Sequence, residues 1–273
     1  MKKNLCLIGA LILSFSAVSC VQLTARVEIR DANDAYEKED YQTALTHYQR
    51  ARRIDPAGFP EIDRMIGYCN IGLFQPDVKD PANEKHADMA IVALQKYLRV
   101  RPDDRIARDA LVGTFLSANR ISQAIDYYRG YLQKNQGDLE AVKSIATLYA
   151  KQGNFAESLN WYEKITLLEP KNPESFYTYG VVLYEKVAKD PPADLAQRLA
   201  FIEKGKVALQ HAIDLKPDYS EAMAYLNLLF RQQALVEKDP LKAQELIKVA
   251  DTIRGNAMDI NRAKKLAAAG PKK

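Results

Sequence analysis

Histidine and cysteine are rare in this chain, which has three of each among its 273 residues. The histidines, His47, His86 and His211, are far apart, and none has a Glu-x-x-His or Cys-x-x-Cys partner within helical reach, as metal ligands usually do. A phosphate-binding glycine loop and a nucleophile elbow are also missing from the sequence. We therefore expect no metal site, no cofactor, no small-molecule substrate and no enzymatic activity.

A large net charge is missing as well. Lysine and arginine number 39 against 35 acidic residues, a formal charge of +4. Lys2 and Lys3 belong to the first 19 residues, which hold no acidic residue, so without that segment 37 basic residues remain against 35 acidic ones. A dedicated nucleic-acid-binding domain concentrates far more positive charge. Nucleic acid is therefore not an expected partner.

The first residues, MKKNLCLIGALILSFSAVSC, differ in composition from the rest of the chain. A basic start, an apolar run and small residues before Cys20 are the layout of a secretory signal peptide. The end of this stretch, Ala-Val-Ser-Cys, resembles a bacterial lipobox, which implies that residues 1–19 are removed and that Cys20 receives lipid. Residues 20–24 are then a short tether to the membrane. Plain secretory cleavage at the same bond and an uncleaved anchor are the alternatives.

Cys69 is the cysteine that remains outside this leader. It lies in the apolar run MIGYCNIGLF, where a buried and inert thiol is the expected state. With Cys6 in the leader and Cys20 carrying lipid, no disulfide framework is available.

A spaced set of side chains recurs along the chain. A small residue is followed, four and seven residues later, by residues that share its helical face, and in most copies a proline then ends the helix. The six copies are Ala44-Tyr48-Ala51, Ala90-Leu94-Tyr97, Ala124-Tyr128-Tyr131, Ser158-Tyr162-Ile165, Gly205-Leu209-Ala212 and Ala243-Ile247-Ala250. Gly255 is the expected end of the last helix.

The spacing between copies indicates a repeat. Successive small residues are 34 positions apart from 90 to 124 and from 124 to 158, and further apart elsewhere. A 34-residue unit of two helices resembles the tetratricopeptide repeat (TPR). The resemblance covers residues 25–252 and implies an all-α fold, a right-handed superhelical solenoid of about six helical hairpins. Small residues of the earlier helices, most clearly Gly67 and Gly180, let neighbouring helices approach closely. Residues 253–273 are expected to form a C-terminal capping helix and tail.

Three insertions interrupt the period, and each contains Lys-Asp-Pro. Aspartate at the N-cap followed by proline at the first helical position is a start signal for a helix. We read each insertion as an extended first helix and a longer turn, with Asp80, Asp190 and Asp239 capping the second helix. A binding role for these lengthened edges is the alternative.

The resemblance also implies a binding groove. In TPR proteins the first helices of successive repeats line a concave surface that binds peptides or partner domains. Carrying that geometry over gives these candidate groove residues: Asn33, Tyr36, Asn70, Lys143, Lys151, Tyr177, Tyr184 and Arg231. The lysine and asparagine clamp of some cochaperone members is not carried over, because other residue types occupy several of its positions.

These features predict a protein-binding scaffold in the bacterial cell envelope. The lipid on Cys20 would tether it to a membrane, and Val21 after the cysteine favours the outer membrane, facing the periplasm. Its partner is expected to be a protein or peptide of an envelope complex whose assembly or stability it assists, as the resemblance to pilotin-type and outer-membrane-assembly repeat lipoproteins implies. The alternatives are a soluble periplasmic adaptor without lipid and an accessory subunit of an envelope enzyme.

Overall fold

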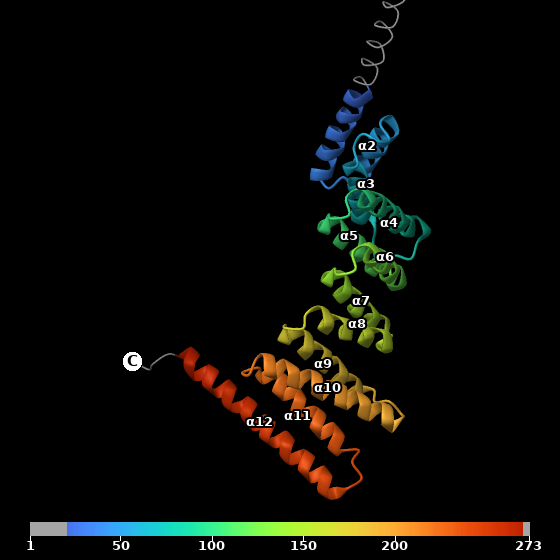
Figure 1. The fold of residues 1–273 in the computed structure, drawn as a ribbon. Coiled ribbons are helices and arrows are strands. Elements are labelled where there is room, and N and C mark those ends of the chain that lie inside the picture. Colours follow the sequence, from blue (N-terminus) through green and yellow to red (C-terminus); the bar gives the residue numbers. More distant parts are fainter. Residues whose placement is uncertain (1–20, 270–273) are drawn as a thin grey trace, which may run out of the picture. The chain divides into compact units, whose positions relative to one another are not determined.

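In the computed structural model, residues 21–269 are described, and their regular structure is entirely helical (Figure 1). After a helix over residues 21–37 come α2 (Tyr41–Ile54), α3 (Glu61–Leu73), α4 (Pro81–Val100), α5 (Arg105–Ser117), α6 (Ile121–Lys134), α7 (Leu139–Gln152), α8 (Phe155–Leu168), α9 (Pro173–Lys189), α10 (Leu195–Leu215), α11 (Ser220–Ala234) and α12 (Pro240–Ala269). Along the described chain they follow one another as six pairs, and we call the members of each pair its first and second helix. The all-α prediction is confirmed.

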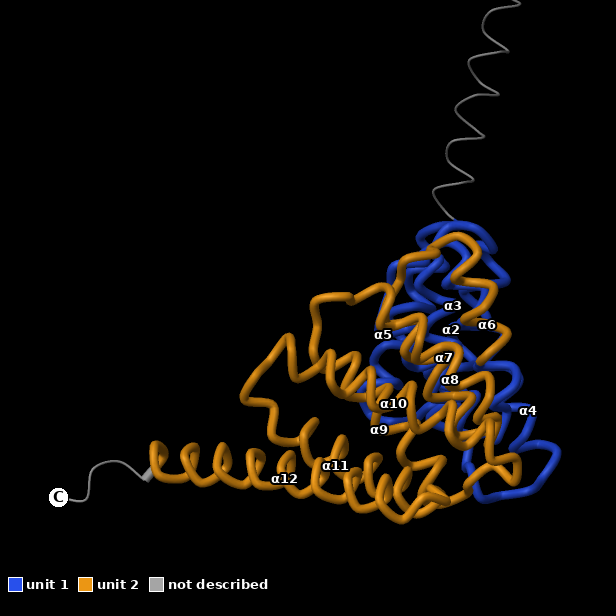
Figure 2. The backbone as a smooth tube through the Cα atoms, turned by 60° about the horizontal axis from the view of Figure 1, so that its bottom comes forward, with its two compact units in different colours: residues 1–124 blue, residues 125–273 orange. Residues whose placement is uncertain are grey.

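The chain divides into two compact units, residues 1–124 and 125–273, drawn in blue and orange in Figure 2. The division falls within α6. Unit 1 contains the helix over residues 21–37 and α2 to α5, and unit 2 contains α7 to α12.

Small residues lie at the helix contacts of unit 1. Ala32, on the helix over residues 21–37, and Ala44, on α2, are fully buried in one hydrophobic cluster. In the next pair, a Cβ atom built on Gly67 of α3 would lie 2.7 Å from the Cγ of Leu94 on α4. Only a residue without a side chain leaves room for that leucine, so the glycine sets how closely α3 and α4 approach.

Unit 2 repeats this arrangement. A Cβ atom on Gly180 of α9 would lie 2.5 Å from the Cγ of Leu209 on α10, and one on Gly205 would lie 2.7 Å from the Cδ1 of Leu229 on α11.

The predicted small positions of the second helices are buried in five copies: Ala44, Ala90, Ala124, Ser158 and Gly205. In the sixth copy Ala243 is partly exposed.

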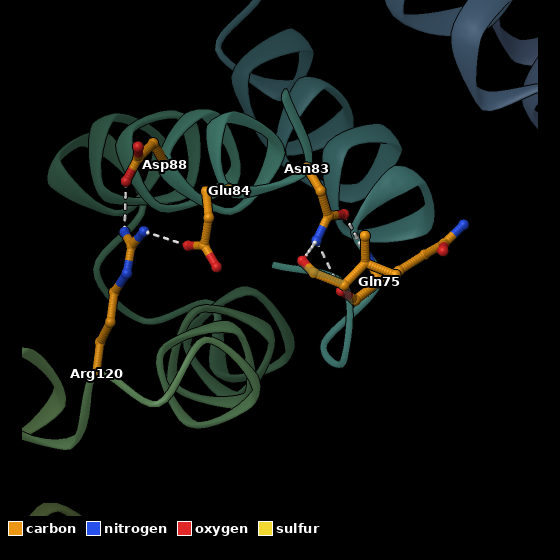
Figure 3. Close-up of polar contacts among 6 residues, drawn as sticks. Gln75, Asn83, Glu84, Asp88 and Arg120 are labelled. Carbon is orange, nitrogen blue, oxygen red and sulfur yellow. Dashed lines mark hydrogen bonds and ion pairs between the residues drawn. The ribbon is translucent and has the colours of Figure 1, made fainter. Parts of the chain in front are cut away.

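A single asparagine holds the first insertion. Asn83, in the first turn of α4, is buried. Its Oδ1 accepts a hydrogen bond from the Gln75 N–H at 2.8 Å, and its Nδ2 donates to the Gln75 and Val78 carbonyl oxygens, both at 2.7 Å (Figure 3). Asp80 caps the same helix, since its carboxylate accepts from the Asn83 N–H at 3.2 Å. The turn before α4 is therefore an ordered connection.

The exposed side of α4 carries an ion-pair bridge, also drawn in Figure 3. Arg120, just before α6, pairs with Glu84 at 3.1 Å and with Asp88, both on α4. One guanidinium thus holds two successive turns of α4, as its two terminal nitrogens allow.

Two of the three predicted aspartate caps are correct. Asp80 and Asp239 precede α4 and α12, and each accepts a hydrogen bond from a backbone N–H of the first turn. Asp190 instead is the C-cap residue of α9, and Asp194 caps α10. The prediction at Asp190 is wrong because Pro192 follows: a residue before proline avoids the helical conformation, so the helix cannot start at the first proline.

The insertions lengthen second helices more than first helices, which differs from our expectation. α4 has 20 residues against 13 for α3, and α10 has 21 against 17 for α9. Gly255 does not end α12, which runs on to Ala269. Ala250 and Ala257, on either side of the glycine, are buried, and this packing outweighs the ~1 kcal/mol that a glycine costs inside a helix. The expected capping helix is therefore a continuation of the last repeat helix.

Candidate functional site

Three tyrosines of unit 2 form a row across two first helices. Tyr177 and Tyr184 are seven residues apart on α9 and so share one helical face. Tyr225 of α11 lies against both: its ring centroid is 5.8 Å from that of Tyr177 and 5.4 Å from that of Tyr184, each in a T-shaped contact. Aromatic rings prefer this geometry. We call these three side chains the tyrosine row.

The hydroxyl groups of the tyrosine row are available to a ligand. All three residues are partly exposed, and none of the three hydroxyls has a hydrogen-bond partner among the residues that the structure describes. Burial raises the pKa of Tyr177 above its ordinary value. The row therefore presents ring edges together with three O–H donors.

Tyr219, just before α11, fixes one end of the row. Its ring centroid lies 5.0 Å from that of Tyr177. The residue is buried, and its hydroxyl donates to the carboxylate of Glu174 in the first turn of α9. Burial and this hydrogen bond raise the pKa of Tyr219. The contact joins the starts of the two first helices and so holds Tyr177 in place.

Arg231 lies on the same helix as Tyr225 but is bound to α12. Its Nη2 donates to the Asp251 Oδ1 at 2.5 Å, and its Nε lies 3.4 Å from the Asn227 Oδ1. The side chain is 32% exposed. The predicted groove residue is therefore accessible, and one of its terminal nitrogens is already paired.

The two predicted groove residues nearest the N-terminus are engaged within unit 1. Asn33 is exposed, and its Oδ1 accepts a hydrogen bond from the Tyr48 hydroxyl at 2.5 Å. Tyr36 is partly buried against the core cluster of that unit and packs edge-on against Tyr41. Both contribute to holding the first pair of helices together.

Asn70 is not a groove residue. It is fully buried: its Nδ2 donates to the Ile66 carbonyl at 2.8 Å, and its Oδ1 lies 2.9 Å from the His86 Nδ1. Asn70 follows Gly67 by three positions, and residues at this spacing share a helical face. It therefore lies on the side of α3 that packs against α4, and the prediction is wrong for this reason.

The two predicted lysines lie on α7, away from the tyrosine row in the chain. Lys143 forms an ion pair with Glu169 at 3.2 Å, and Lys151, in the last turn, is exposed. Of the predicted groove residues, the structure brings Tyr177 and Tyr184 into one contact network.

Sequence reasoning missed Tyr225. Five of the eight candidates, such as Tyr177 and Tyr184 around Gly180, lie three positions before or four positions after the small residue of a first helix, whereas Tyr225 precedes the small-residue position, Asn227, by two. That offset turns its ring toward α9, the preceding first helix, which α11 contacts. A tyrosine at this offset next to tyrosines on the preceding first helix is the signal that could have identified it.

The histidines do not form a metal site. His47 lies 2.7 Å from a carboxylate oxygen of Glu28, and the ring of His211 packs edge-on against Phe176, while His86 contacts the buried asparagine of α3. Within residues 21–269, no group of three or more His, Cys, Asp and Glu side chains is placed to hold a metal ion. In the same range, no helix has both the length and the apolar character that crossing a bilayer requires.

A hollow of unit 2 runs along α10. It encloses about 990 Å³, and Leu167 and Val207 on its walls are mostly exposed. At its rim Lys204 pairs with Glu163 at 3.6 Å and Lys206 pairs with Glu203 at 2.8 Å. This apolar hollow lacks the row of unpaired hydroxyls that the α9–α11 face has.

Comparison with known proteins identifies the repeat type in part of the chain. Residues 115–177, from the end of α5 to the start of α9, match the family model for the tetratricopeptide repeat. This segment carries the tetratricopeptide repeat. A TPR repeats protein from Bacteroides fragilis is similar in structure, with a TM-score of 0.53 and 15% identity over 78% of this chain and 99% of that one. The C-terminal part of a TPR repeat-containing protein from Cytophaga hutchinsonii has a TM-score of 0.52 and 15% identity over 86% and 80%. At this identity the likeness concerns the fold.

The relatives found by sequence match this chain over only part of their own length. The photosystem I assembly protein Ycf3 of Prochlorococcus marinus is 31% identical over 101 residues, which is 35% of this chain and 58% of that protein. The human protein O-mannosyl-transferase TMTC1 is 23% identical over 195 residues, 70% of this chain and 18% of that protein. The chain thus spans less than two thirds of the length of either relative.

Proposed function

We propose that this TPR protein is a protein-interaction scaffold and that the tyrosine row is the centre of its binding face. The observation that carries the proposal is the row itself: three adjoining tyrosines, partly exposed, whose hydroxyls lack partners among the described residues. The three hydroxyls are open to solvent, so a ligand can replace the water that would otherwise satisfy them.

The chemistry of the row suits a segment of polypeptide. Tyrosine gives a large contact area at a low cost in side-chain entropy, and it is enriched at the centres of protein interfaces. Tyr177 and Tyr184 are ~10 Å apart along α9, because each helical residue rises 1.5 Å. That length matches about three residues of extended chain, so three hydroxyls could each meet one backbone carbonyl of a bound peptide.

We further propose that the scaffold assists the assembly of a protein complex. The support is the similarity of 101 residues to Ycf3, which is named as an assembly protein. A scaffold holds its partners through surfaces, and the stacked helical pairs provide these surfaces without catalytic groups.

The proposed place of action is the bacterial cell envelope, with the lipid on Cys20 as the tether to the outer membrane. The support comes from the first 20 residues of the sequence, with their basic start, apolar run and Ala-Val-Ser-Cys end. These residues lie outside the described part of the chain. A protein that reaches the periplasm without lipid on Cys20 would be a soluble adaptor.

The binding face can be tested by removing its hydroxyls alone. In a full-length triple variant, Tyr177→Phe, Tyr184→Phe and Tyr225→Phe keep the rings and so the packing. Tyr162→Phe is the matched control, because the Tyr162 hydroxyl also lacks a partner among the described residues but belongs to the second helix α8.

Each variant is used to capture proteins from detergent-solubilised membranes, with quantitative mass spectrometry as the readout. We expect proteins that wild type and the Tyr162→Phe control retain to be lost from the triple variant. If the triple variant retains the same proteins in the same amounts as wild type, the tyrosine row is not the binding face.

A further inference from the structure

A polar hollow of unit 2, about 340 Å³ in volume, lies between α11 and α12, and we call it the α11–α12 groove. Figure 1 shows α12 running alongside α11. Arg231, Arg254 and Asn261 provide polar groups to its lining, and Leu228, Ala257 and Met258 provide apolar ones. The groove therefore combines hydrogen-bond donors with an apolar wall.

The donors of the groove are only partly used within the protein. Arg254 is exposed and has no ion pair or hydrogen bond to any described residue. Asn261 accepts the Ser220 hydroxyl on its Oδ1 at 2.8 Å, which leaves its amide N–H groups to a ligand. Arg231 uses its Nε and Nη2 in contacts to Asn227 and Asp251, which leaves its Nη1.

The charge of the groove favours an anion. Among the described residues that line it, the two arginines are the charged ones, and no carboxylate is among them. Asp251, outside the lining, pairs with Arg231, while Arg254 forms no ion pair with a described residue. Arginine binds carboxylates well because its planar guanidinium offers two parallel N–H donors.

The ends of the groove limit what can occupy it. Two contacts bridge α11 and α12: Ser220 with Asn261 at one end, and Arg231 with Asp251 at the other. Residues 220 and 231 are ~16 Å apart along the helix, so a chain that lies along the groove between the two bridges is limited to about this length. The end of a chain, with a carboxylate and an apolar last side chain, fits this length and the mixed lining.

We propose that the α11–α12 groove binds the C-terminal residue of a protein partner, with the terminal carboxylate on Arg254, Arg231 and Asn261 and an apolar last side chain against Leu228 and Met258. This rests on the proposed function only in that the partner is a protein. The groove lies on the α12 side of α11 and the tyrosine row on its α9 side. One partner can therefore reach both.

The test uses the full chain labelled with ¹³C at its methionine methyl groups. The chain has five methionines, so the Met258 signal can be assigned with a Met258→Leu variant and reports directly on the groove. Three probes are titrated: acetyl-Ala-Ala-Ala-Leu with a free carboxylate, the same peptide as its C-terminal amide, and an amidated peptide with aspartate as its third residue.

We expect the free acid to shift the Met258 signal and to bind at least about tenfold more tightly than the amide, the size of one lost charge-assisted hydrogen bond. Arg254→Gln should weaken binding of the free acid by a similar factor. Arg262→Gln is the matched control, an exposed arginine of α12 that does not line the groove, and it should leave binding unchanged.

Any of four results would overturn the proposal. The acid and the amide bind with equal affinity, or the aspartate peptide binds as tightly as the free acid. Arg254→Gln and Arg262→Gln weaken binding of the free acid equally, or millimolar phosphate displaces the peptide. The capture experiment on the tyrosine row has a separate outcome. If the acid and amide peptides bind equally while the tyrosine variant still loses its partners, only the groove proposal is refuted. A tyrosine variant that keeps every partner refutes the binding face, whatever the peptides do.

Discussion

Gly180 of α9 lies directly against Leu209 of α10, and a Cβ atom on the glycine would be 2.5 Å from the leucine Cγ. Leu209 is fully buried, so it has little room to move away. Gly67 and Leu94 form the equivalent contact in unit 1. The same pair of residue types thus sets the closest approach of the two helices in two different repeats.

Gly180→Ala should therefore destabilise the protein. The added methyl group overpacks a filled contact, which typically costs ~1–3 kcal/mol. Urea unfolding followed by circular dichroism measures the change. Gly255→Ala is the control: Gly255 is also inside a helix, but a Cβ atom there meets nothing within 4 Å, and alanine should add ~0.5–1 kcal/mol of stability. Destabilisation by both substitutions would mean that α12 does not run through Gly255 as a regular helix.

Asn83→Ala should loosen the first insertion. The substitution leaves the Gln75 N–H and the Gln75 and Val78 carbonyl groups without their side-chain partner, and unpaired groups of this kind cost ~1–3 kcal/mol. Hydrogen exchange at the Gln75 amide should accelerate together with the loss of stability. Asn160→Ala, at an exposed site on α8, should change stability by less than ~0.5 kcal/mol. Unchanged exchange at Gln75 would contradict the role of Asn83.

The Cys69 thiol should be unreactive while the protein is folded. Burial raises its pKa to about 12, whereas an unfolded chain has a thiol pKa of about 8.5. We expect Cys69, in a chain whose Cys6 and Cys20 are replaced by serine, to react with a disulfide reagent at pH 8 only after urea is added. Rapid labelling without urea would show that the thiol is accessible.

The same pKa shift makes stability fall in alkali. Above about pH 8.5 the unfolded chain loses the thiol proton that the folded chain keeps, so the unfolded state binds fewer protons and the free energy of unfolding decreases as pH rises, by at most ~1.4 kcal/mol per pH unit. Unfolding between pH 8 and 9.5 should show this slope in wild type. Cys69→Ala should reduce it, and an identical slope in both would exclude the thiol as its source.

Cys20→Ser should release the protein from membranes if Cys20 carries lipid. Wild type should then incorporate a metabolic lipid probe and sediment with the membrane fraction, and the variant should do neither. Cys6→Ser is the control, since it changes a cysteine inside the expected leader. Wild-type protein that takes up no lipid probe would favour the soluble adaptor.

The helical periodicity predicted which residues are packed against neighbouring helices, because the same packing contacts recur from repeat to repeat. Ala44, Ser158 and Gly205 are buried where the spacing placed them, since each copy must present a small side chain to its neighbours. Helix ends were harder to predict. One cause is competition between local signals: two prolines follow Asp190, and the second prevents a helix from starting at the first. The other cause is tertiary contact, since packing allows α12 to continue through Gly255.

The candidate site could be predicted only in part. Tyr177 and Tyr184 belong to one helix, so their common face follows from sequence spacing alone. Tyr225 contacts them from α11, and Arg254 of α12 lines the same groove as Arg231 of α11. Such pairings depend on how far one helix is offset along another, and the offset is set by insertions whose shape the sequence pattern does not determine. Arg254 could not be selected because its segment was read as a separate cap.

The unbroken course of α12 also has a mechanical consequence. Thirty residues of helix form a rod ~45 Å long, and the contacts of Lys264 with Asp218, Ser220 with Asn261, and Arg231 with Asp251 are spread along its length. A pull on the C-terminal end along the rod axis loads these contacts in shear, all at once, whereas a pull across the axis would open them one after another. The rod should therefore resist axial force far better than transverse force, and single-molecule pulling in the two directions would show the difference.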